Sequence, residues 1–342
     1  MKIKKLFMER AIQLANNGIG IISPNPIVGC VIEINGLIIS EAWNYQCENE
    51  HAEVKAINKI KNDSLFLKST LYVTLEPCSH LGTTPSCVDL IIKKKISIVV
   101  IGAKSPFIKS RIGIKKLKKY GIKVIENYLH DQCRIINKRF FTFYEKNRPF
   151  IILKWDQSYD GFIASSFKKN ECISNIYSRQ LTHKWRSEED SILVGEKTIL
   201  MDNPELNTIK WNGKNPVKIF LDKELSIPNY YHLFDNKQDT IIFTEKKIEK
   251  KNNKIEFIQI CFDQKLLEQI LFFLFKKKIQ SIIVEGGKKI LEIFIKKNIW
   301  DESRVFISNK IFNDGLNAPI VNGNIILKKN IDTDILIIKS FY

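Results

Sequence analysis

The sequence lacks an apolar run long enough to span a membrane, and its N-terminus lacks the apolar core of a signal peptide. Residues 1–6 lead instead into an amphipathic pattern. Cysteine is scarce as well, because the chain has seven of them, an odd number that cannot all pair, and no internal repeat is evident. These absences exclude a membrane-spanning protein and a disulfide framework, and we expect a cytoplasmic protein with reduced thiols.

Acidic residues are few for the number of basic ones. The chain has 54 Lys and Arg residues against 37 Asp and Glu residues, which gives a formal net charge of +17. Clustered lysines bind nucleic-acid phosphates, but here they are spread along the whole chain, as in 91–96 and 275–278. We therefore expect solvated lysine surfaces that attract phosphorylated small molecules, and no nucleic-acid or membrane partner.

A group of soft metal ligands begins at residue 51. His51-Ala52-Glu53 is followed by Pro77-Cys78 and then by Cys87. One imidazole and two thiolates meet the three-ligand count of a catalytic zinc ion, whose fourth position stays open. Zinc lowers the pKa of bound water, so a nearby Glu53 is placed to move protons to a ring nitrogen and a departing amine. The pattern predicts one zinc ion and hydrolytic deamination, with Glu53 as the catalytic residue. The remaining cysteines are expected to be reduced thiols: Cys30, Cys47, Cys133, Cys172 and Cys261.

This order of residues resembles the cytidine-deaminase-like superfamily, in which an H-x-E triplet precedes P-C and a second cysteine. Deaminases of nucleosides, tRNA and DNA usually have P-C-x-x-C, whereas eight residues, 79–86, separate Cys78 from Cys87. That longer spacer is similar to the riboflavin-biosynthesis deaminases. A second block of the same family is matched by Pro24-Asn25-Pro26-Ile27-Val28-Gly29-Cys30.

Hydrophobic periodicity divides the chain near Arg148-Pro149 into two domains, 1–147 and 148–342. The first is predicted to contain helices at 6–16, 51–60, 87–94 and 115–120, strands at 70–75, 97–102 and 123–126, and a hairpin over 29–39 that turns at Asn35-Gly36. The second is predicted to contain strands at 150–154, 191–195, 217–221, 240–243 and 281–284 and helices at 178–188, 265–275 and 288–297. This alternation predicts two α/β layered domains.

The turn Glu285-Gly286-Gly287 falls between a predicted strand and a predicted helix, where glycines admit a pyrophosphate to a helix N-terminus. A plain Gly-Gly turn is the alternative. The order of neighbouring residues resembles the reductase half of the bifunctional riboflavin-biosynthesis proteins: Lys154, Ser158, Asp160-Gly161, Ile173-Ser174, Arg186, Gly195, Thr198 and Asp202-Asn203-Pro204-Glu205-Leu206. The resemblance then covers nearly the whole chain.

The resemblance implies a three-layer cytidine-deaminase-like domain followed by a dihydrofolate-reductase-like domain that uses NADPH. It implies deamination of 2,5-diamino-6-ribosylamino-4(3H)-pyrimidinone 5′-phosphate, and then reduction of the ribosyl group to ribityl. The implied substrate contacts are Asn25, His80, Lys154, Arg186, Leu206 and Glu285. The implied NADPH contacts are Asp156, Ser174, Thr198, Asp202, Gly286 and Gly287. It leaves the oligomeric state open.

Some of these residues have a structural alternative. Asn25 can instead cap a turn between two prolines, and His80 can be a surface histidine. Arg186 and Asp202 can instead form ordinary surface ion pairs. Lys154, at a strand end, is either structural or directed at the substrate.

The chain departs from the family pattern at several positions. The family usually has a histidine at Asn44, a basic residue at Thr83, an Asp-Pro-Asn-Pro block at 104–107 and an arginine near Ile209. A lysine supplies charge without the geometry of arginine, and the candidates for compensation are Lys104, Lys109 and Lys210. We expect both activities to survive with weakened substrate binding. The alternatives are a chain with one activity, a nucleic-acid deaminase of the tRNA type and a non-catalytic zinc module.

Overall fold

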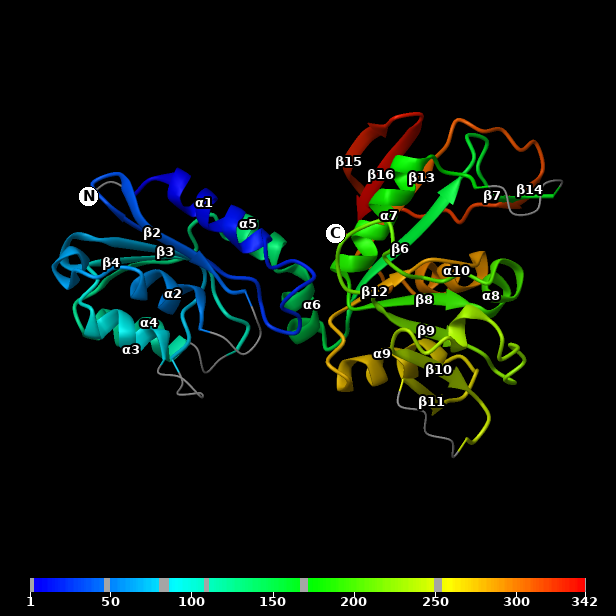
Figure 1. Ribbon diagram of the computed structural model, residues 1–342, viewed down its shortest axis with the longest axis horizontal. Coiled ribbons are helices and arrows are strands. Elements are labelled where there is room, and N and C mark those ends of the chain that lie inside the picture. The colour runs from blue at the N-terminus through cyan, green and yellow to red at the C-terminus, as the bar shows by residue number, and fades with distance from the viewer. Residues whose placement is uncertain are drawn as a thin grey trace. The chain divides into compact units, whose positions relative to one another are not determined.

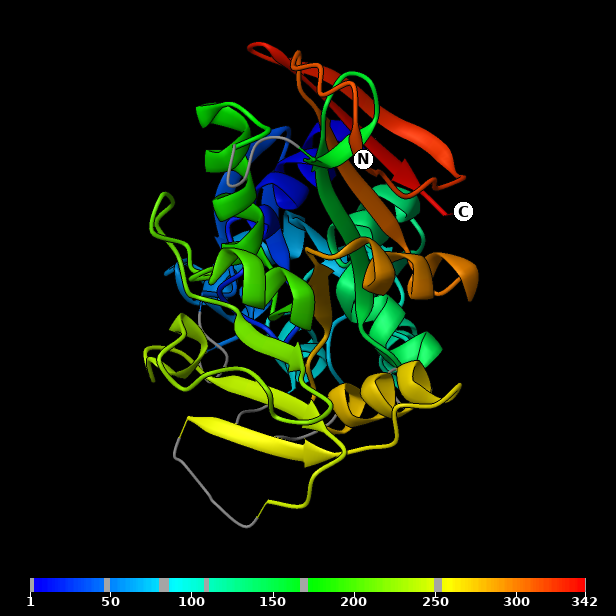
Figure 2. The same cartoon turned by 90° about the vertical axis from the view of Figure 1, so that its right-hand side faces the viewer.

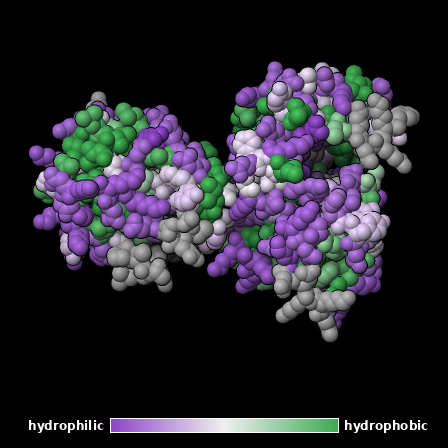
Figure 3. Space-filling model, in the orientation of Figure 1, coloured by the Kyte–Doolittle hydropathy of each residue, from purple (hydrophilic) through white to green (hydrophobic). Residues whose placement is uncertain are grey.

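The computed structural model describes residues 3–45, 50–79, 86–107, 111–166, 172–248 and 254–341. The chain forms two compact units, Met1–Lys146 and Asn147–Tyr342, so the division falls one residue before the boundary drawn from the sequence. Hydrophilic residues cover most of the face of each unit that is seen in Figure 3. None of the described helices combines the length and the apolarity that crossing a membrane requires.

The first unit is built around a five-stranded sheet with the strand order β2-β1-β3-β4-β5. Its strands are β1 (Gly29–Ile34), β2 (Leu37–Trp43), β3 (Thr70–Leu75), β4 (Ile98–Ala103) and β5 (Lys123–Ile125). β1 is antiparallel to β2 and to β3, whereas β3, β4 and β5 are parallel. Every residue of β3 and β4 is buried, because these central strands are covered on both faces.

Helices cover both faces of this sheet (Figure 1). They are α1 (Lys5–Asn16), α2 (Ala52–Asn58), the 3-10 helix η1 (Asp63–Lys68), α3 (Cys87–Lys93), α4 (Arg111–Lys119), α5 (His130–Ile136) and α6 (Lys138–Lys146). α1 and α5 pack on one face around a core that includes Phe7, Met8 and Cys133. α2, α3 and α4 pack on the other face around Ala56 and Val88. The expected three-layer architecture is confirmed.

Two glycines fix the ends of β1. The hairpin to β2 turns at Asn35 and Gly36, whose φ angles are 50° and 90°, as a type I′ turn requires. At the start of the strand, a Cβ on Gly29 would lie 1.9 Å from the carbonyl oxygen of Ala11. The absent side chain therefore lets α1 lie directly against the first residue of β1.

The second unit contains a nine-stranded sheet with the order β11-β10-β9-β8-β12-β6-β13-β16-β15. Its strands are β6 (Phe150–Gln157), β8 (Ser191–Gly195), β9 (Val217–Leu221), β10 (Thr240–Thr244), β11 (Ile255–Gln259), β12 (Ser281–Val284), β13 (Glu302–Ile307), β15 (Asn324–Ile331) and β16 (Asp334–Ser340). The strands from β11 to β13 are parallel, and β16 and β15 extend the sheet as an antiparallel edge. β7 (Phe162–Ser165) and β14 (Gly315–Asn317) form a separate two-stranded ribbon.

Helices α7 (Ile176–Glu188), α8 (Glu196–Asp202), α9 (Leu266–Lys276) and α10 (Lys288–Lys296) cover the larger sheet, and η3 (His232–Phe234) is a 3-10 turn. Residues Ile151 and Leu153 of β6 face the core that includes α9 and α10, whereas Ile152 faces Trp185 of α7. Figures 1 and 2 show α9 and α10 on the face of the sheet opposite α7 and α8. The α/β architecture expected for this domain is confirmed.

Several elements were not predicted, and four of them, β13, β15, α5 and α6, have a physical reason. β13 contains the buried charges Glu302 and Arg304, which hide the apolar pattern of a buried strand. β15 is exposed along almost its whole length, so it shows no alternation between apolar and polar residues. α5 and α6 are short and are separated by Asn137, which obscures a helical period. The short elements α8, β7, β11, β14 and β16 were also missed.

Candidate active sites

The predicted zinc ligands meet at the edge of the first sheet where β3 and β4 end. Cys78 follows β3, and the N–H of Glu76 donates to the carbonyl oxygen of Ala103, the last residue of β4, at 2.9 Å. Because β1 is antiparallel to β3, β1 begins at this same edge, and the N–H of Gly29 donates to Oγ1 of Thr74 at 3.1 Å. The loop before β1 therefore lies at the edge from which Cys78 projects.

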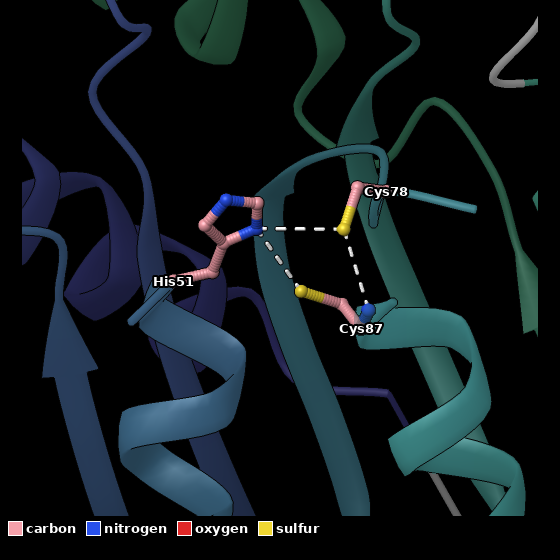
Figure 4. Close-up of side chains that lie close together, drawn as sticks. All are labelled: His51, Cys78 and Cys87. Atoms are coloured by element: carbon pink, nitrogen blue, oxygen red, sulfur yellow. Dashed lines mark hydrogen bonds between the residues drawn. The ribbon is translucent and has the colours of Figure 1, made fainter. Parts of the chain in front are cut away.

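Two helix starts supply the other two ligands. His51 is the residue before α2, and Cys87 is the first residue of α3. Nδ1 of His51 lies 3.2 Å from Sγ of Cys87 and 3.5 Å from Sγ of Cys78 (Figure 4). The backbone N–H of Cys87 donates to Sγ of Cys78 at 3.3 Å. All three ligand atoms lie within 4.8 Å of one another, so the structure brings together the three predicted zinc ligands.

The donor set fits a divalent cation. The hydrogen bond between Cys78 and Cys87 lowers the pKa of Cys78 to about 4. The hydrogen bond with Cys78 raises the pKa of His51 to about 9 and, together with burial, raises the pKa of Cys87. The protein alone therefore favours a single thiolate, stabilised by an imidazolium ion and a thiol. A bound divalent cation supplies the charge that stabilises a second thiolate and a neutral imidazole, which is the ligand state zinc requires.

Glu53 lies in the first turn of α2, beside these ligands. Its side chain is buried, and Oε2 has no hydrogen-bond partner among the residues that the structure describes. Burial raises the pKa of Glu53, and the charge of Glu53 contributes to the raised pKa of Cys87. A buried carboxylate with an unused acceptor beside a metal-ligand cluster is suited to carrying protons.

Of the other residues predicted for this site, some are described by the structure and some are not. Asn25 is exposed in the loop before β1, whereas His80 and Thr83 lie outside the described residues. Nζ of Lys104 forms an ion pair with Glu126 at 2.9 Å.

The departure from the family pattern at 104–107 is held in place by contacts within the first unit. The ring of Phe107 packs edge-on against Tyr144, with 4.7 Å between centroids. The backbone N–H of Ser105 donates to the buried Glu76 at 3.1 Å. Lys109, one of the lysines considered as compensation, lies outside the described residues. Segment 104–107 is thus anchored by an ion pair, an aromatic contact and a hydrogen bond.

A second set of predicted residues gathers where the parallel strands β8 and β12 of the second unit end, beside β6. Lys154 lies three residues before the end of β6, and not at a strand end as expected. Nε and Nη2 of Arg186 donate to the two oxygens of Glu285 at 2.9 and 2.7 Å. The two side chains are only 15% and 5% exposed, so this is a buried pair and not the surface pair considered above. Burial raises the pKa of Glu285, but the charges of Arg186 and Lys154 outweigh it and hold this pKa below its usual value.

Lys154, Asp156 and Ser174 form a second polar group close to this pair. Nζ of Lys154 lies 2.9 Å from Oδ1 of Asp156, and Oγ of Ser174 donates to Oδ2 at 2.7 Å. β6 and β12 are adjacent and parallel, so Lys154 on β6 and Glu285 after β12 lie side by side. Ligands of parallel α/β sheets bind at such carboxyl ends.

The predicted cofactor residues Thr198, Gly286 and Gly287 also lie together. A Cβ on Gly286 would lie 3.2 Å from Cγ2 and from Oγ1 of Thr198, and Gly287 has a φ angle of 69° just before α10. The two glycines therefore leave open a backbone cradle at the N-terminus of α10, which fits the pyrophosphate of a nicotinamide cofactor. Asp202 is exposed at the end of α8, and the side chain of Leu206 is buried in the core, so that its backbone is the part available to a ligand.

His183 was missed by the sequence analysis. It lies one helical turn before Arg186 on α7, and burial together with the charge of Arg186 lowers its pKa to about 4. Lys210 adds to this effect, whereas Ile209 is 79% exposed. The three-residue spacing from Arg186 was the available signal. Lys210, one of the lysines proposed to replace the missing arginine, therefore interacts electrostatically with His183 at this site.

Family models match both parts of the chain. Residues 1–103 match the "cytidine and deoxycytidylate deaminase zinc-binding region", and residues 149–333 match the "RibD C-terminal domain". These matches cover the metal-ligand cluster in the first unit and the charged strand ends in the second. They imply zinc for the first unit and a nicotinamide cofactor for the second.

Relatives match over almost the whole chain. The riboflavin biosynthesis protein RibD of Aquifex aeolicus is 36% identical over 92% of this chain and 89% of that protein. RibD of Actinobacillus pleuropneumoniae is 33% identical over 89% and 83%. The solved diaminohydroxyphosphoribosylaminopyrimidine deaminase/5-amino-6-(5-phosphoribosylamino)uracil reductase of Thermotoga maritima is 33% identical, with a TM-score of 0.90 over 98% of each chain. The chain therefore belongs to the RibD family of riboflavin-biosynthesis enzymes, in which a deaminase and a reductase are joined in one polypeptide.

Proposed function

We propose that the first unit deaminates 2,5-diamino-6-ribosylamino-4(3H)-pyrimidinone 5′-phosphate. The second unit then uses NADPH to reduce the ribosyl group, giving 5-amino-6-ribitylamino-uracil 5′-phosphate. The observation that carries this proposal is the cluster of His51, Cys78 and Cys87 with the buried carboxylate of Glu53 beside it. We place both reactions in the cytoplasm, as the reduced thiols and phosphorylated ligands favour.

In the first reaction, His51, Cys78 and Cys87 hold zinc. When bound, zinc supplies the Lewis acidity that lets water act as a nucleophile near neutral pH. Glu53 accepts one proton from the attacking water and delivers it to the ring nitrogen. It then takes the second proton of that water and delivers it to the departing amine, which leaves as ammonia. Its burial favours this cycle, because burial raises the pKa of Glu53 and so makes the carboxylate a better proton acceptor. Asn25 and His80 orient the pyrimidine.

In the second reaction, the chain holds the cofactor and orients the sugar. NADPH supplies the hydride when bound. Gly286 and Gly287 admit its pyrophosphate to the start of α10, with Thr198, Asp202, Asp156 and Ser174 as further contacts. Arg186 and Glu285 act as one buried pair that presents donors and acceptors to the phosphorylated substrate, next to Lys154 and the backbone of Leu206.

The test is a two-step assay on the full-length protein, combined with metal analysis. We expect about one zinc per chain, ammonia release from the diaminopyrimidine phosphate without NADPH, and NADPH oxidation once the deaminated product is present. Ammonia release without NADPH oxidation would show that the protein has the deaminase activity but not the reductase activity. No ammonia release from zinc-loaded protein at any substrate concentration would contradict the proposal. Base conversion in RNA would favour the tRNA-type deaminase.

A further inference from the structure

The main chain of the loop that enters β1 is held by two carboxamide side chains. Residues 26, 27 and 28 are consecutive, and their main chain makes four hydrogen bonds with the side chains of Asn44 and Asn137, two as donor and two as acceptor. These two residues come from different elements, 16 and 110 residues away from their partners. Two such side chains on one short loop indicate that its path is fixed by the rest of the unit.

Asn44 holds the two ends of this segment. Its Oδ1 accepts from the N–H of Val28 at 2.7 Å, and its Nδ2 donates to the carbonyl oxygen of Pro26 at 2.8 Å. Its own N–H donates to the carbonyl oxygen of Val28 at 3.3 Å. A histidine at this position could not reproduce the amide's adjacent donor and acceptor geometry. In this chain, position 44 therefore supports the loop.

Asn137 holds the residue in the middle. Its Oδ1 accepts from the N–H of Ile27 at 2.9 Å, and its Nδ2 donates to the carbonyl oxygen of Ile27 at 2.8 Å. Asn137 is only 3% exposed, between α5 and α6. Removing its amide would leave a buried N–H and a buried C=O without these partners, which is costly in a site closed to water.

The loop lies at the catalytic edge of the sheet. It runs from Asn25 into β1, which begins where β3 ends and where Cys78 follows. Cys30, the second residue of β1, is close enough to the site that the charge of Glu53 contributes to its raised pKa, after the larger effect of burial. A displacement of residues 26–28 would therefore move Asn25 relative to the metal ligands.

We propose that Asn44 and Asn137 are positioning residues for deamination, which fix the loop at 26–28 and thereby hold Asn25 at the substrate. This role rests on the proposed function of Asn25 as a substrate contact. The two amides touch neither the metal ligands nor Glu53 through any hydrogen bond found among the described residues. Their loss lowers the fraction of the protein in the binding-competent conformation, and this raises KM more than it lowers kcat.

The test is a double-mutant cycle on the full-length, zinc-loaded protein. Asn137→Ala and Asn44→Ala should each raise the deaminase KM by about tenfold, given the usual cost of orphaned buried polar groups. In an Asn25→Ala background, the same changes should raise KM no further, because the residue through which they act is gone. Asn44→Asp keeps the acceptor for Val28 and loses the donor to Pro26, so it should lie between Asn44→Ala and the wild type.

Three measurements separate this role from a general loss of structure. Zinc content and the NADPH-dependent rate on the deaminated substrate should not change. Hydrogen exchange of the Ile27 and Val28 amides should accelerate. Asn62→Ala is the matched control: Asn62 also accepts from a backbone N–H, that of Ser64 at 3.1 Å, but it lies before β3, at the opposite end of that strand from Cys78. Its deaminase KM should match that of the wild type.

Additive effects in the Asn25→Ala background would overturn the proposal, as would a lower melting temperature with unchanged KM. A wild-type KM for Asn25→Ala would overturn it too. Since Asn44 is only half-buried, Asn44→Ala keeps the test decisive should Asn137→Ala not fold. Absence of ammonia release from the zinc-loaded wild type is a separate outcome, because it would remove the proposed deamination itself and the positioning role with it.

Discussion

The two units organise their sites in different ways. In the first, the metal ligands and Glu53 lie within residues 51–87, and the ligand atoms of His51, Cys78 and Cys87 face one another across short distances. In the second, the predicted site residues extend from Lys154 to Gly287, and they form ion pairs and hydrogen bonds with one another. A site whose chemistry comes from a metal needs a few ligands in a short motif, whereas one that orients a cofactor and a sugar draws on several strand ends.

The largest expected effect is on deaminase activity, and it tests whether the chemistry of the first site depends on one side chain, Glu53. Glu53→Gln removes the proton carrier and keeps the metal ligands, so deaminase kcat should fall by about 10²- to 10⁴-fold. Zinc content and the reductase rate should stay unchanged. Ammonia release and metal analysis measure the two halves of this expectation. Glu50→Gln, an exposed residue of the same kind nearby, is the control, and an active Glu53→Gln protein would contradict the assignment.

The next largest effect is on stability, and it tests whether the second site depends on the buried ion pair of Arg186 and Glu285. Arg186→Met leaves Glu285 buried without its partner and should cost roughly 3–5 kcal/mol of the free energy of unfolding. Replacing both residues by methionine should recover most of that loss. Denaturation followed by tryptophan fluorescence reports mainly on the second unit, which holds four of the five tryptophans. As a control, Glu224→Ala breaks an exposed ion pair with Lys246 and should cost about 0–1 kcal/mol of the free energy of unfolding. A loss as large as that of Arg186→Met would contradict the distinction between the buried and the exposed pair.

A smaller effect concerns pH. Burial and Arg186 lower the pKa of His183 from 6.5 to about 4. Between these values the unfolded chain binds the proton and the folded chain does not, so this residue makes stability rise with pH from about 4 to 6.5. His183→Gln should reduce that rise by on the order of 1–3 kcal/mol. Unfolding of both proteins at pH 4.5 and pH 7.5 measures it, and identical pH profiles would show that His183 is not held neutral.

The smallest effect concerns the glycine cradle. Gly286→Ala places a methyl group against Thr198 and should weaken NADPH binding by about 1 kcal/mol, or roughly fivefold. Thr198→Ser removes one of the two crowded atoms and should restore part of the affinity. Titration of NADPH fluorescence measures both variants. Deaminase activity serves as the internal control, and unaltered NADPH affinity in Gly286→Ala would place the pyrophosphate elsewhere.

The parts of the fold that could be predicted from the sequence are those with local patterns. β3 has the bounds expected from its apolar run, and the hairpin turns where Asn35-Gly36 indicated. β13 and β15 could not be found in this way, because one buries charged side chains and the other is exposed. Their positions are decided by neighbouring strands and helices, and no short window of sequence contains that information.

The same distinction applies to the candidate sites. The grouping of His51, Cys78 and Cys87 followed from ligand chemistry and spacing, and the family resemblance named Arg186 and Glu285. Nothing in the sequence indicated that these two residues bind each other, since they lie 99 positions apart. The contacts of Asn137 are equally non-local, because its partner Ile27 lies 110 residues earlier.

The hydrogen bonds between Asn137 and Ile27 set a lower limit on the size of an excised deaminase. The zinc-binding region recognised by the family model ends at residue 103, before α4, β5, α5 and α6. A fragment cut there would retain every metal ligand and yet expose the face of the sheet that α5 covers, and it would release the loop before β1. A free-standing deaminase made from this polypeptide has to extend past Asn137. Phe140 and Phe141 of α6 are part of the same core as α1 and α5, so it should include α6, to Lys146.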